Sequence, residues 1–372
     1  CIIIKSTTAN SYIESINQTT GLTIITRAFV ERILLTNNSH AHGVVFKRNN
    51  TEYHMYANNE IILTAGPINT PQVLMLSGIG PRIHLEELNI PVVRDLPVGN
   101  NLQDQVFVPL YYRIDNQTTR QVDPYPRFDV TNLYEYFHNA SGPLAHHADG
   151  VTYYSSSVNP NGTNWPDTMI ISVVEFFNNL NATVEQYASN QNEWRQYWQP
   201  YSNDGYYLAI DPVLARPTSR GTVRLNATNP LSAPLIDPNY LSNRTDFEAL
   251  LDVTRFIVRA LQRYPLTGVM QFPPIPGCPL TGCNLTETLC EIYLRCHIRQ
   301  LARSYYNFAG TARMGLANDT EAVVDPEFHV IGFDNLRIID ASIIPEIPNG
   351  HIIAATIMLG EKGSQLIIQD NQ

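Results

Sequence analysis

The run from Gly66 to Gly80 constrains the fold of this chain more than any other segment. It reads G-P-I-N-T-P-Q-V-L-M-L-S-G-I-G, with glycines and prolines where a backbone turns or passes close to another group. The apolar residues 73–76 predict the start of a packed helix, and residues 77–81 predict its end. The preceding run 61–65 predicts a buried strand that leads directly into Gly66, an arrangement that lays backbone against a nucleotide.

Length and charge limit the class of protein. The 372 residues suffice for two domains with sizeable cores, because compact domains usually hold about 100–200 residues. The chain has 24 Lys and Arg against 34 Asp and Glu, a net charge of −10, which argues against nucleic acid or an anionic membrane as the main partner. No stretch reaches the roughly 18 consecutive apolar residues of a spanning helix. We therefore expect a globular protein with no nucleic-acid partner and no membrane span.

Sequons and cysteines indicate a secreted, extracellular protein. Four of the five cysteines lie between residues 278 and 296, which predicts two disulfides, nested as Cys278–Cys296 and Cys283–Cys290. A zinc site is the alternative, although the tight CxxC pairs typical of zinc sites do not occur among these cysteines. Cys1 is left over, either free or bonded to a partner chain. Eleven Asn-x-Ser/Thr sequons predict N-linked glycans, and they begin at Asn17, Asn37, Asn49, Asn116, Asn139, Asn161, Asn181, Asn226, Asn243, Asn284 and Asn318.

The composition predicts an α/β plus α+β fold in three segments. Residues 1–104 form part of a first domain, residues 105–300 form a second, substrate-facing domain rich in Tyr, Asn, Pro and Ser, and residues 301–372 return to the first domain. Strands of one sheet are expected in the first segment, at 22–26, 29–35, 43–47 and 54–63.

Two helices and two further strands are expected in the later segments. Thr245 to Glu248 has the sequence of a capping box, which predicts a helix whose apolar side belongs to the core. Residues 219–225 predict a turn and strand. Residues 336–340 predict a buried strand ending in the carboxylate of Asp340, and a helix is expected at 352–367.

Several strings of this chain together resemble the glucose-methanol-choline (GMC) family of FAD-dependent oxidoreductases. The run 66–80 matches the second signature of that family position for position. Residues 98–105 read V-G-N-N-L-Q-D-Q and are similar to the family string VGxNLQDH, with Gln105 where His is usual. Further strings follow in family order at 310–311, 314–315, 323–326, 336–337 and 340–342. The resemblance covers residues 6 to 368 and is closest to the secreted insect glucose-dehydrogenase-like branch.

The resemblance implies the GMC fold, with an incomplete Rossmann-like FAD domain and an antiparallel-sheet substrate domain. It implies FAD as cofactor, with the adenine by Val30, the pyrophosphate by Asp340 and Ala341, and the flavin pyrimidine edge by Ile352. Ala65 and Gly66, at the turn after the strand, complete the implied cofactor-binding set. Asn349 can cap the final helix, whose N-terminus would favour the negative charge of reduced flavin.

The resemblance also implies the catalytic residues. GMC enzymes usually place a pair of polar side chains at the flavin face, the first a histidine in a W-H-P-x-G-T string. Here that string is Tyr306 to Thr311, and Asn307 stands where the histidine is usual. The second position falls on His351. Because an amide cannot accept a proton at neutral pH, His351 is the expected base, and Asn307 its hydrogen-bonding partner.

No metal site is expected. The other histidines have no motif around them, and the adjacent pair at 146–147 lacks a partner spacing for a metal. We expect structural or solvated roles for His40, His42, His54, His84, His138, His146, His147, His297 and His329.

Three functions are compatible with these residues. The first is a secreted FAD-dependent oxidoreductase that oxidises an alcohol or sugar hydroxyl of a small molecule by hydride transfer to flavin N5, with His351 as base. The second is an FAD-dependent hydroxynitrile lyase, which needs a base but no hydride acceptor. The third is a catalytically retired GMC-fold glycoprotein, which the substitutions at 105 and 307 favour.

One element of a dinucleotide site is missing from this sequence. No G-x-G-x-x-G opening a βαβ unit occurs in the 372 residues, and in the family this fingerprint lies nearer the N-terminus. No signal peptide opens the sequence either. We therefore expect an N-terminal segment of the same protein, as a separate chain or as part of a longer one, that completes the FAD domain.

Overall fold

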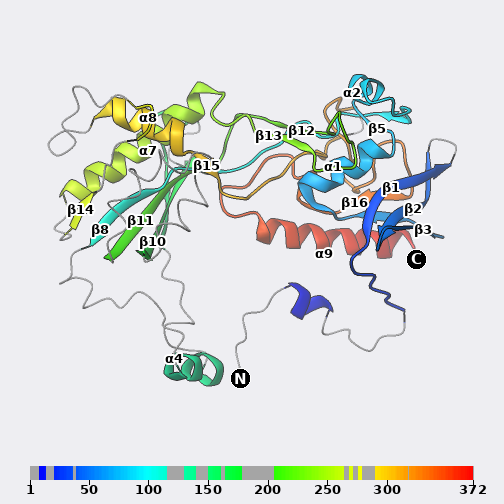
Figure 1. The fold of residues 1–372 in the computed structure, drawn as a ribbon, viewed down its shortest axis with the longest axis horizontal. Coiled ribbons are helices and arrows are strands. Elements are labelled where there is room, and N and C mark those ends of the chain that lie inside the picture. Colours follow the sequence, from blue (N-terminus) through cyan, green and yellow to red (C-terminus); the bar gives the residue numbers. More distant parts are fainter. Residues whose placement is uncertain are drawn as a thin grey trace. The chain divides into compact units, whose positions relative to one another are not determined.

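The computed structural model divides into two compact units (Figure 1). Unit 1 comprises Cys1–Ile24, Phe107–Val213 and Ala249–Arg303, and unit 2 comprises Ile25–Val106, Leu214–Glu248 and Ser304–Gln372. Unit 2 thus includes residues 214–248, which the sequence analysis assigned to the second domain at 105–300. The structure describes residues 8–13, 21–36, 39–114, 130–139, 150–160, 164–177, 205–263, 268–270, 275–278, 290–316 and 318–371.

Unit 2 contains an antiparallel meander of three strands in the order β1-β2-β3. These are β1 (Phe29–Thr36), β2 (His40–Arg48) and β3 (Thr51–Tyr56). In β1 and β2 buried and less buried side chains alternate, which places one face of the sheet on the core. The expected strand at 22–26 is wrong, because these residues form neither helix nor strand and all their side chains are exposed.

A parallel pair of strands lies beside the core of unit 2. β4 (Ile61–Leu63) pairs with β16 (Leu336–Ile338), and both residues at the ends of β16 are fully buried. The expectation of one strand over 54–63 is wrong, since β3 ends at Tyr56 and β4 belongs to a different sheet. Parallel pairing joins segments distant in sequence, so alternation within 54–63 could not reveal the break.

Helix α1 (Gly66–Leu76) follows β4 after two residues, as expected, but it begins seven residues earlier than the apolar run suggested. Pro67 lies in the first turn, where a backbone N–H needs no partner in the helix. Pro71 lacks the N–H that would bond the carbonyl of Pro67, and the Thr311 hydroxyl donates to that carbonyl instead, at 2.7 Å. A long-range bond therefore permits proline inside this helix.

The end of α1 agrees with the sequence. The helix ends at Leu76 with Ser77 as its C-cap, and Gly78 follows with φ of +81°. A Cβ on Gly78 would lie 2.4 Å from the carbonyl oxygen of Pro91, so only glycine fits this turn. The Ser77 hydroxyl accepts the backbone N–H of Ile33 at 2.8 Å, which links α1 to β1.

Helix α9 (Ile353–Asp370) ends the described chain, close to the expected 352–367. Its buried residues are Leu359 and Gly363, and a Cβ on Gly363 would lie 2.5 Å from the Ile339 side chain, so glycine permits close packing after β16. Apolar residues elsewhere on α9 are exposed: Ile353, Ile357, Met358 and Ile368. No described helix is long and apolar enough to cross a membrane.

Short elements complete unit 2 around an apolar core that includes Leu74, Met75 and Leu85. β5 and β6 pair in parallel and β12 and β13 pair antiparallel, so the turn and strand expected at 219–225 is confirmed. The bounds are β5 (Ile79–Gly80), α2 (Arg82–Glu87), β6 (Arg94–Asp95), β12 (Thr222–Arg224), β13 (Leu235–Asp237) and the 3-10 helix η7 (Ala341–Ile343).

Unit 1 is built on a sheet whose main path runs β14-β8-β11-β10-β9. The pairs β9–β10, β8–β11 and β8–β14 are antiparallel, in agreement with the expected antiparallel sheet. Its strands are β8 (Leu110–Ile114), β9 (Gly150–Tyr154), β10 (Thr168–Phe177), β11 (Gly205–Leu214) and β14 (Gly268–Met270). The other elements are η1 (Ala9–Ile13), α4 (Val130–Tyr134), η3 (Glu135–Asn139), α8 (Glu291–Leu301), and β7 (Val106–Phe107) and β15 (Arg303–Ser304) at the unit boundary.

Helix α7 (Arg244–Arg263) has the buried apolar face that the sequence predicts, although its start differs. The Thr245 backbone N–H donates to Asn243 Oδ1 at 2.9 Å, so Asn243 caps the helix and the predicted capping box is wrong. Asp246 instead accepts the backbone N–H of Thr218 at 2.9 Å. The buried residues of the apolar face are Phe247, Leu250, Leu251, Ile257 and Val258, and Leu261 is half-buried.

A disulfide joins Cys278 to Cys296 on α8, as predicted. These two cysteines are therefore not ligands of the alternative zinc site. Cys290 is disulfide-bonded as well, and its predicted partner Cys283 lies outside the described residues. The sulfur of Cys290 also accepts the backbone N–H of Tyr293 at 3.4 Å, so this cysteine caps α8.

Candidate active site

Two backbone segments of unit 2 frame the predicted catalytic pair. Gln103 and Ala309 exchange backbone hydrogen bonds of 3.0 and 2.9 Å, and the Tyr305 N–H donates to the Gln105 carbonyl at 2.8 Å. Gly310 has φ of +86°, and a Cβ there would lie 2.7 Å from the carbonyl oxygen of Asn101. Glycine at this position therefore lets segments 101–105 and 305–310 pack against each other.

Asn307 is buried and joins three neighbours. Its backbone N–H donates to Asp104 Oδ1 at 2.8 Å. Its side-chain Nδ2 lies 2.8 Å from Gln105 Oε1 and 3.4 Å from Nδ1 of His351. The structure therefore brings together the two residues that the sequence assigned to catalysis, although 44 positions separate them.

His351 precedes α9 and is exposed. Its ring stacks on Tyr305 with centroids 5.3 Å apart and 17° between the planes. The N-cap of α9 is Ile352, which makes no side-chain capping bond. The expectation that Asn349 caps the helix is wrong, because the helix begins beyond its reach, and His351 does not serve as a side-chain cap either. The imidazole is therefore held by stacking and one long contact, and it is open to solvent.

Gln105 connects Asn307 to the loop before His351. Its side chain is fully buried. Its Nε2, which carries two hydrogens, lies within hydrogen-bond distance of three carbonyl oxygens, those of Ala215 at 3.0 Å, Pro348 at 3.1 Å and Gly350 at 3.2 Å. The sequence showed Gln105 only as a departure from the resembling family, and its contacts show that it links Asn307 to the loop that precedes His351.

Asp104 supports Asn307 from the other side. Burial raises the pKa of its carboxyl, and this rise is opposed by hydrogen bonds from Ser304, from the Tyr240 hydroxyl and from the backbone of Asn307. Burial, together with the charge of Asp104, also raises the pKa of Tyr240, which therefore stays protonated as a donor. Sequence reasoning missed this pair, because Asp104 and Tyr240 lie 136 positions apart.

Four of the six expected cofactor-binding residues lie just after the paired strands β4 and β16. Asp340 Oδ2 accepts the backbone N–H of Gly66 at 2.9 Å and the Thr70 hydroxyl at 2.6 Å, while Oδ1 accepts the Ser342 N–H at 2.7 Å. Ala65 precedes α1, and Ala341 follows Asp340 as a buried residue. Asp340 thus holds the ends of the two parallel strands together.

Two expected positions are not joined to this cluster by described hydrogen bonds. Val30 lies on β1 with a side chain that is 36% exposed, and Ile352 lies at the start of α9. Their roles toward the adenine and the flavin stay predictions.

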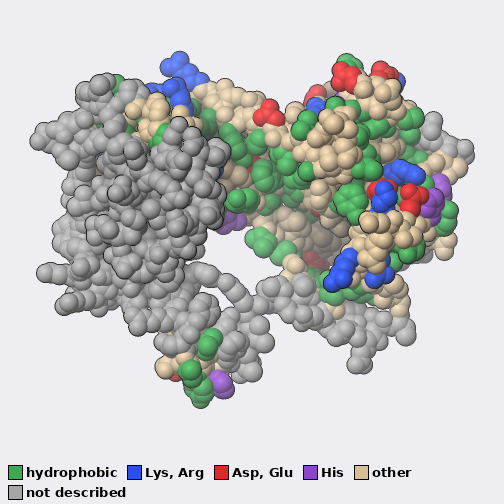
Figure 2. Space-filling model, in the orientation of Figure 1, with side chains coloured by type: hydrophobic (Ala, Val, Ile, Leu, Met, Phe, Trp, Pro, Cys, Tyr) green, Lys and Arg blue, Asp and Glu red, His purple; other side chains and the backbone are tan. Residues whose placement is uncertain are grey.

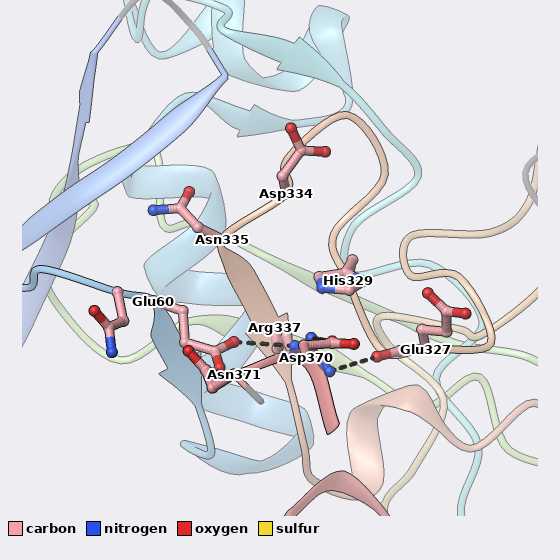
Figure 3. A pocket seen from close by; sticks show the side chains of 9 residues that line it. Glu60, Glu327, His329, Asp334, Asn335, Arg337, Asp370 and Asn371 are labelled. Carbon is pink, nitrogen blue, oxygen red and sulfur yellow. Dashed lines mark hydrogen bonds and ion pairs between the residues drawn. The ribbon is translucent and has the colours of Figure 1, made fainter. Parts of the chain in front are cut away.

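A separate polar pocket of about 410 Å³ surrounds Arg337 (Figure 3). The guanidinium is buried and pairs with Glu60 at 3.0 Å and with Asp370, and it donates to the Glu327 carbonyl at 3.3 Å. The lining residues are Asn59, Glu60, Glu327, His329, Asp334, Asn335, Arg337, Asp370 and Asn371.

Two of the lining residues, Glu327 and His329, form a cluster with Asp325 in which potential metal ligands lie within 4.8 Å of one another, a proximity that the sequence did not reveal. Asp325 Oδ1 accepts the backbone N–H groups of Glu327 and His329, both at 2.9 Å. These bonds close a turn in the segment that also contributes the Glu327 carbonyl to Arg337.

Comparison with known proteins identifies the family. Sequence profiles described as GMC oxidoreductase match residues 3–107 and 217–360. Human mitochondrial choline dehydrogenase is 32% identical over 365 residues, covering 96% of this chain and 56% of that protein, and the oxygen-dependent choline dehydrogenase of Cronobacter sakazakii is also 32% identical, covering 96% and 59%. The chain belongs to the GMC oxidoreductase family. It spans little more than half the length of these relatives.

Solved structures agree on the fold. Formate oxidase of Aspergillus oryzae superposes with a TM-score of 0.73 at 24% identity, covering 92% of this chain and 60% of that chain. Pyridoxine 4-oxidase, described as from Mesorbium loti, gives a TM-score of 0.71 at 23% identity, covering 96% and 61%. The expected GMC fold is therefore confirmed.

FAD is the cofactor of this family, and two features of unit 2 fit it. The β4–α1 turn is open, because Ala65 is exposed and a Cβ on Gly66 would meet nothing within 4 Å. At the other end, the 18-residue helix α9 starts without a side-chain cap, so its first N–H groups and partial positive charge suit an anionic flavin edge. When bound, the flavin supplies the hydride acceptor.

Proposed function

We propose that this protein is a secreted FAD-dependent oxidoreductase that oxidises a hydroxyl group of a small alcohol or sugar. His351 accepts the hydroxyl proton, and Asn307 donates a hydrogen bond to the substrate oxygen. The residues near Gly66 and Asp340 would hold the phosphate end of the cofactor, and the start of α9 would favour the negative charge of the reduced flavin.

The contact between Asn307 Nδ2 and His351 Nδ1, 3.4 Å long, carries this proposal. It places a hydrogen-bond donor beside a proton acceptor, and a hydroxyl group needs one of each. Membership of the GMC oxidoreductase family supports oxidation as the reaction type. Choline is a suitable first probe because two of the relatives are choline dehydrogenases.

Flavin reduction in the intact natural protein tests the proposal. Choline, benzyl alcohol and D-glucose would be mixed anaerobically with the protein while the flavin absorption band is followed. We expect at least one of them to bleach the band. A His351→Ala variant should bleach about 10²–10⁴-fold more slowly, because a positioned general base contributes that much.

His40 offers a matched control. It is also an exposed histidine with an Asn amide, that of Asn335, 3.4 Å from a ring nitrogen. His40→Ala should leave bleaching unchanged. Equal bleaching rates in His351→Ala and wild type would contradict the role of His351 as base. A colourless natural protein would favour the catalytically retired alternative. Cyanide release from a cyanohydrin without bleaching would favour the lyase.

We further propose that another segment of the same protein completes the FAD domain. This chain spans 54–59% of the curated relatives and contains no G-x-G-x-x-G. Apolar side chains remain exposed on β4, where Ile62 is 40% accessible, and on α9. Figure 2 shows hydrophobic side chains at the described surface. Intact-mass measurement of the natural protein under reducing conditions should reveal about 200–300 further residues, as one chain or two.

Secretion and N-glycosylation are supported by the accessible sequons and the cysteine pairing. Among the described sequons, the asparagines at 49, 139, 243 and 318 are exposed, and Asn226 is half-buried. The Cys278–Cys296 disulfide is typical of an oxidising compartment. Removal of N-glycans with an amidase should lower the mass of the natural protein by several glycans, and an unchanged mass would contradict the assignment.

A further inference from the structure

The side chain of Gln105 has only one chemically possible orientation. Three backbone carbonyl oxygens, of Ala215, Pro348 and Gly350, lie 3.0–3.2 Å from one end of its amide. Carbonyl oxygens only accept hydrogen bonds, so that end must be the NH2 group. The amide oxygen therefore faces Asn307.

This orientation fixes the next amide in turn. Gln105 Oε1 only accepts, so Asn307 must present its NH2 group across the 2.8 Å contact. One hydrogen of that NH2 binds Gln105, and the other points toward Nδ1 of His351, 3.4 Å away. A lone pair on Nδ1 suits this N–H, so the contact favours the neutral tautomer that keeps its proton on Nε2.

We propose that Gln105 is a positioning residue that acts through Asn307 to make Nδ1 the proton-accepting nitrogen of His351. This inference rests on the proposed function and deepens it. A contact of 3.4 Å is longer than a normal hydrogen bond, so a substrate hydroxyl can replace it. The hydroxyl O–H bond then breaks, an N–H bond forms at Nδ1, and the electron pair left on oxygen accepts the Asn307 N–H.

With the opposite amide orientation the site would lose this capacity. Asn307 would turn its oxygen toward His351, Nδ1 would carry the proton, and no acceptor would remain on the Asn307 side. Histidine at 105, usual in the resembling family string, can itself donate to a carbonyl through one nitrogen and accept from Asn307 through the other. Gln105→His should therefore preserve the orientation of the Asn307 amide. Gln105→Met removes both the hydrogen-bond donor and the acceptor of this side chain at similar volume.

Gln103 provides a matched control two residues away. It is also buried, donates to the Pro345 carbonyl at 2.9 Å and accepts the Ile347 N–H at 3.2 Å. It anchors the same loop, but its side-chain hydrogen bonds involve neither Asn307 nor His351. Gln103→Met should disturb the loop as much as Gln105→Met without changing the orientation of Asn307.

Nitrogen NMR of histidine-labelled natural protein tests the proposal at alkaline pH, where the ring is neutral. The His351 signal is assigned by its loss in His351→Asn. In wild type we expect a pyridine-type shift for Nδ1 and a pyrrole-type shift for Nε2. The ratio of the two tautomers should move about 2–10-fold toward Nδ1–H in Gln105→Met, and stay at the wild-type value in Gln105→His and Gln103→Met.

The outcomes separate this inference from the proposed function. Wild-type protein with its proton on Nδ1 overturns the inference even if alcohols bleach the flavin, and so does an unchanged tautomer ratio in folded Gln105→Met. The expected tautomers in a protein whose flavin no alcohol reduces support the positioning by Gln105 and reject oxidation. If both hold, flavin reduction by the active probe should slow about tenfold in Gln105→Met.

Discussion

His297 in unit 1 and His351 in unit 2 are the same residue in opposite surroundings. His297 is 2% exposed, its Nε2 donates to the Pro109 carbonyl at 3.0 Å, and burial lowers its pKa to about 4. His351 is exposed, stacks on Tyr305 and has one contact of 3.4 Å to Asn307. Burial makes the first imidazole a neutral structural donor, whereas the second lies at the surface beside the amide of Asn307.

The largest difference should appear in stability. His297→Ala removes a buried ring and leaves the Pro109 carbonyl without its donor, so we expect a loss of about 3–4 kcal/mol. His351→Ala should change stability by no more than about 0.5 kcal/mol, as exposed substitutions usually do. Urea unfolding of both variants measures the change in the free energy of unfolding. A comparable loss in the two variants would contradict the contrast between a structural and an exposed histidine.

The pH dependence of stability should follow His297. Its pKa falls from 6.5 to about 4 on folding, so the unfolded chain binds a proton that the folded chain refuses. Stability should decline as pH drops from 6.5 to about 4, by about 3 kcal/mol in total. Urea unfolding across this range should show that His297→Gln lacks this component while His351→Gln keeps it.

The disulfide beside His297 should contribute a similar amount. Cys278–Cys296 closes a sequence separation of 18 residues, for which chain entropy predicts about 3 kcal/mol. Replacing both cysteines by serine should lower the unfolding free energy of unit 1 by that amount and leave flavin reduction nearly intact. A large loss of flavin reduction in otherwise folded protein would show that the region around His297 also serves the reaction.

The smallest effect is expected at Asn307. Asn307→Ala removes the proposed donor to the substrate oxygen, but the base remains, so flavin reduction should slow about tenfold. This is less than the loss expected for His351→Ala. If Asn307→Ala proved the more damaging variant, the roles assigned to the two side chains would need to be exchanged.

Several elements could be read from the sequence because local patterns determine them. The signature run located α1 and the turn that follows it at Gly78. The apolar spacing after Asn243 located the buried face of α7, and the clustered cysteines predicted the Cys278–Cys296 pair. The failures are equally local. Exposed residues 22–26 alternate like a strand without forming one. Helix α7 is capped by Asn243 and not by the capping box predicted at 245–248, because several residues nearby could cap the same helix.

The two departures from the family strings illustrate what the sequence could not show. Gln105 and Asn307 each replace a usual histidine, and in the structure they are hydrogen-bonded to each other at 2.8 Å. In the sequence, each substitution favoured a catalytically retired protein. In the structure, the two side-chain amides form a hydrogen-bonded chain that leads to His351. Their contact spans 202 positions, and no periodicity reports on such a distance.

The sequence by itself determined the family, the order of most elements and the candidate base His351, because these depend on residue types and short spacings. Only the tertiary structure decided that Gln105, Asn307 and His351 converge, and which end of each amide faces its neighbour. Packing of distant segments sets those contacts, and once buried, each donor must meet an acceptor or cost free energy, so the fold leaves the amides one orientation.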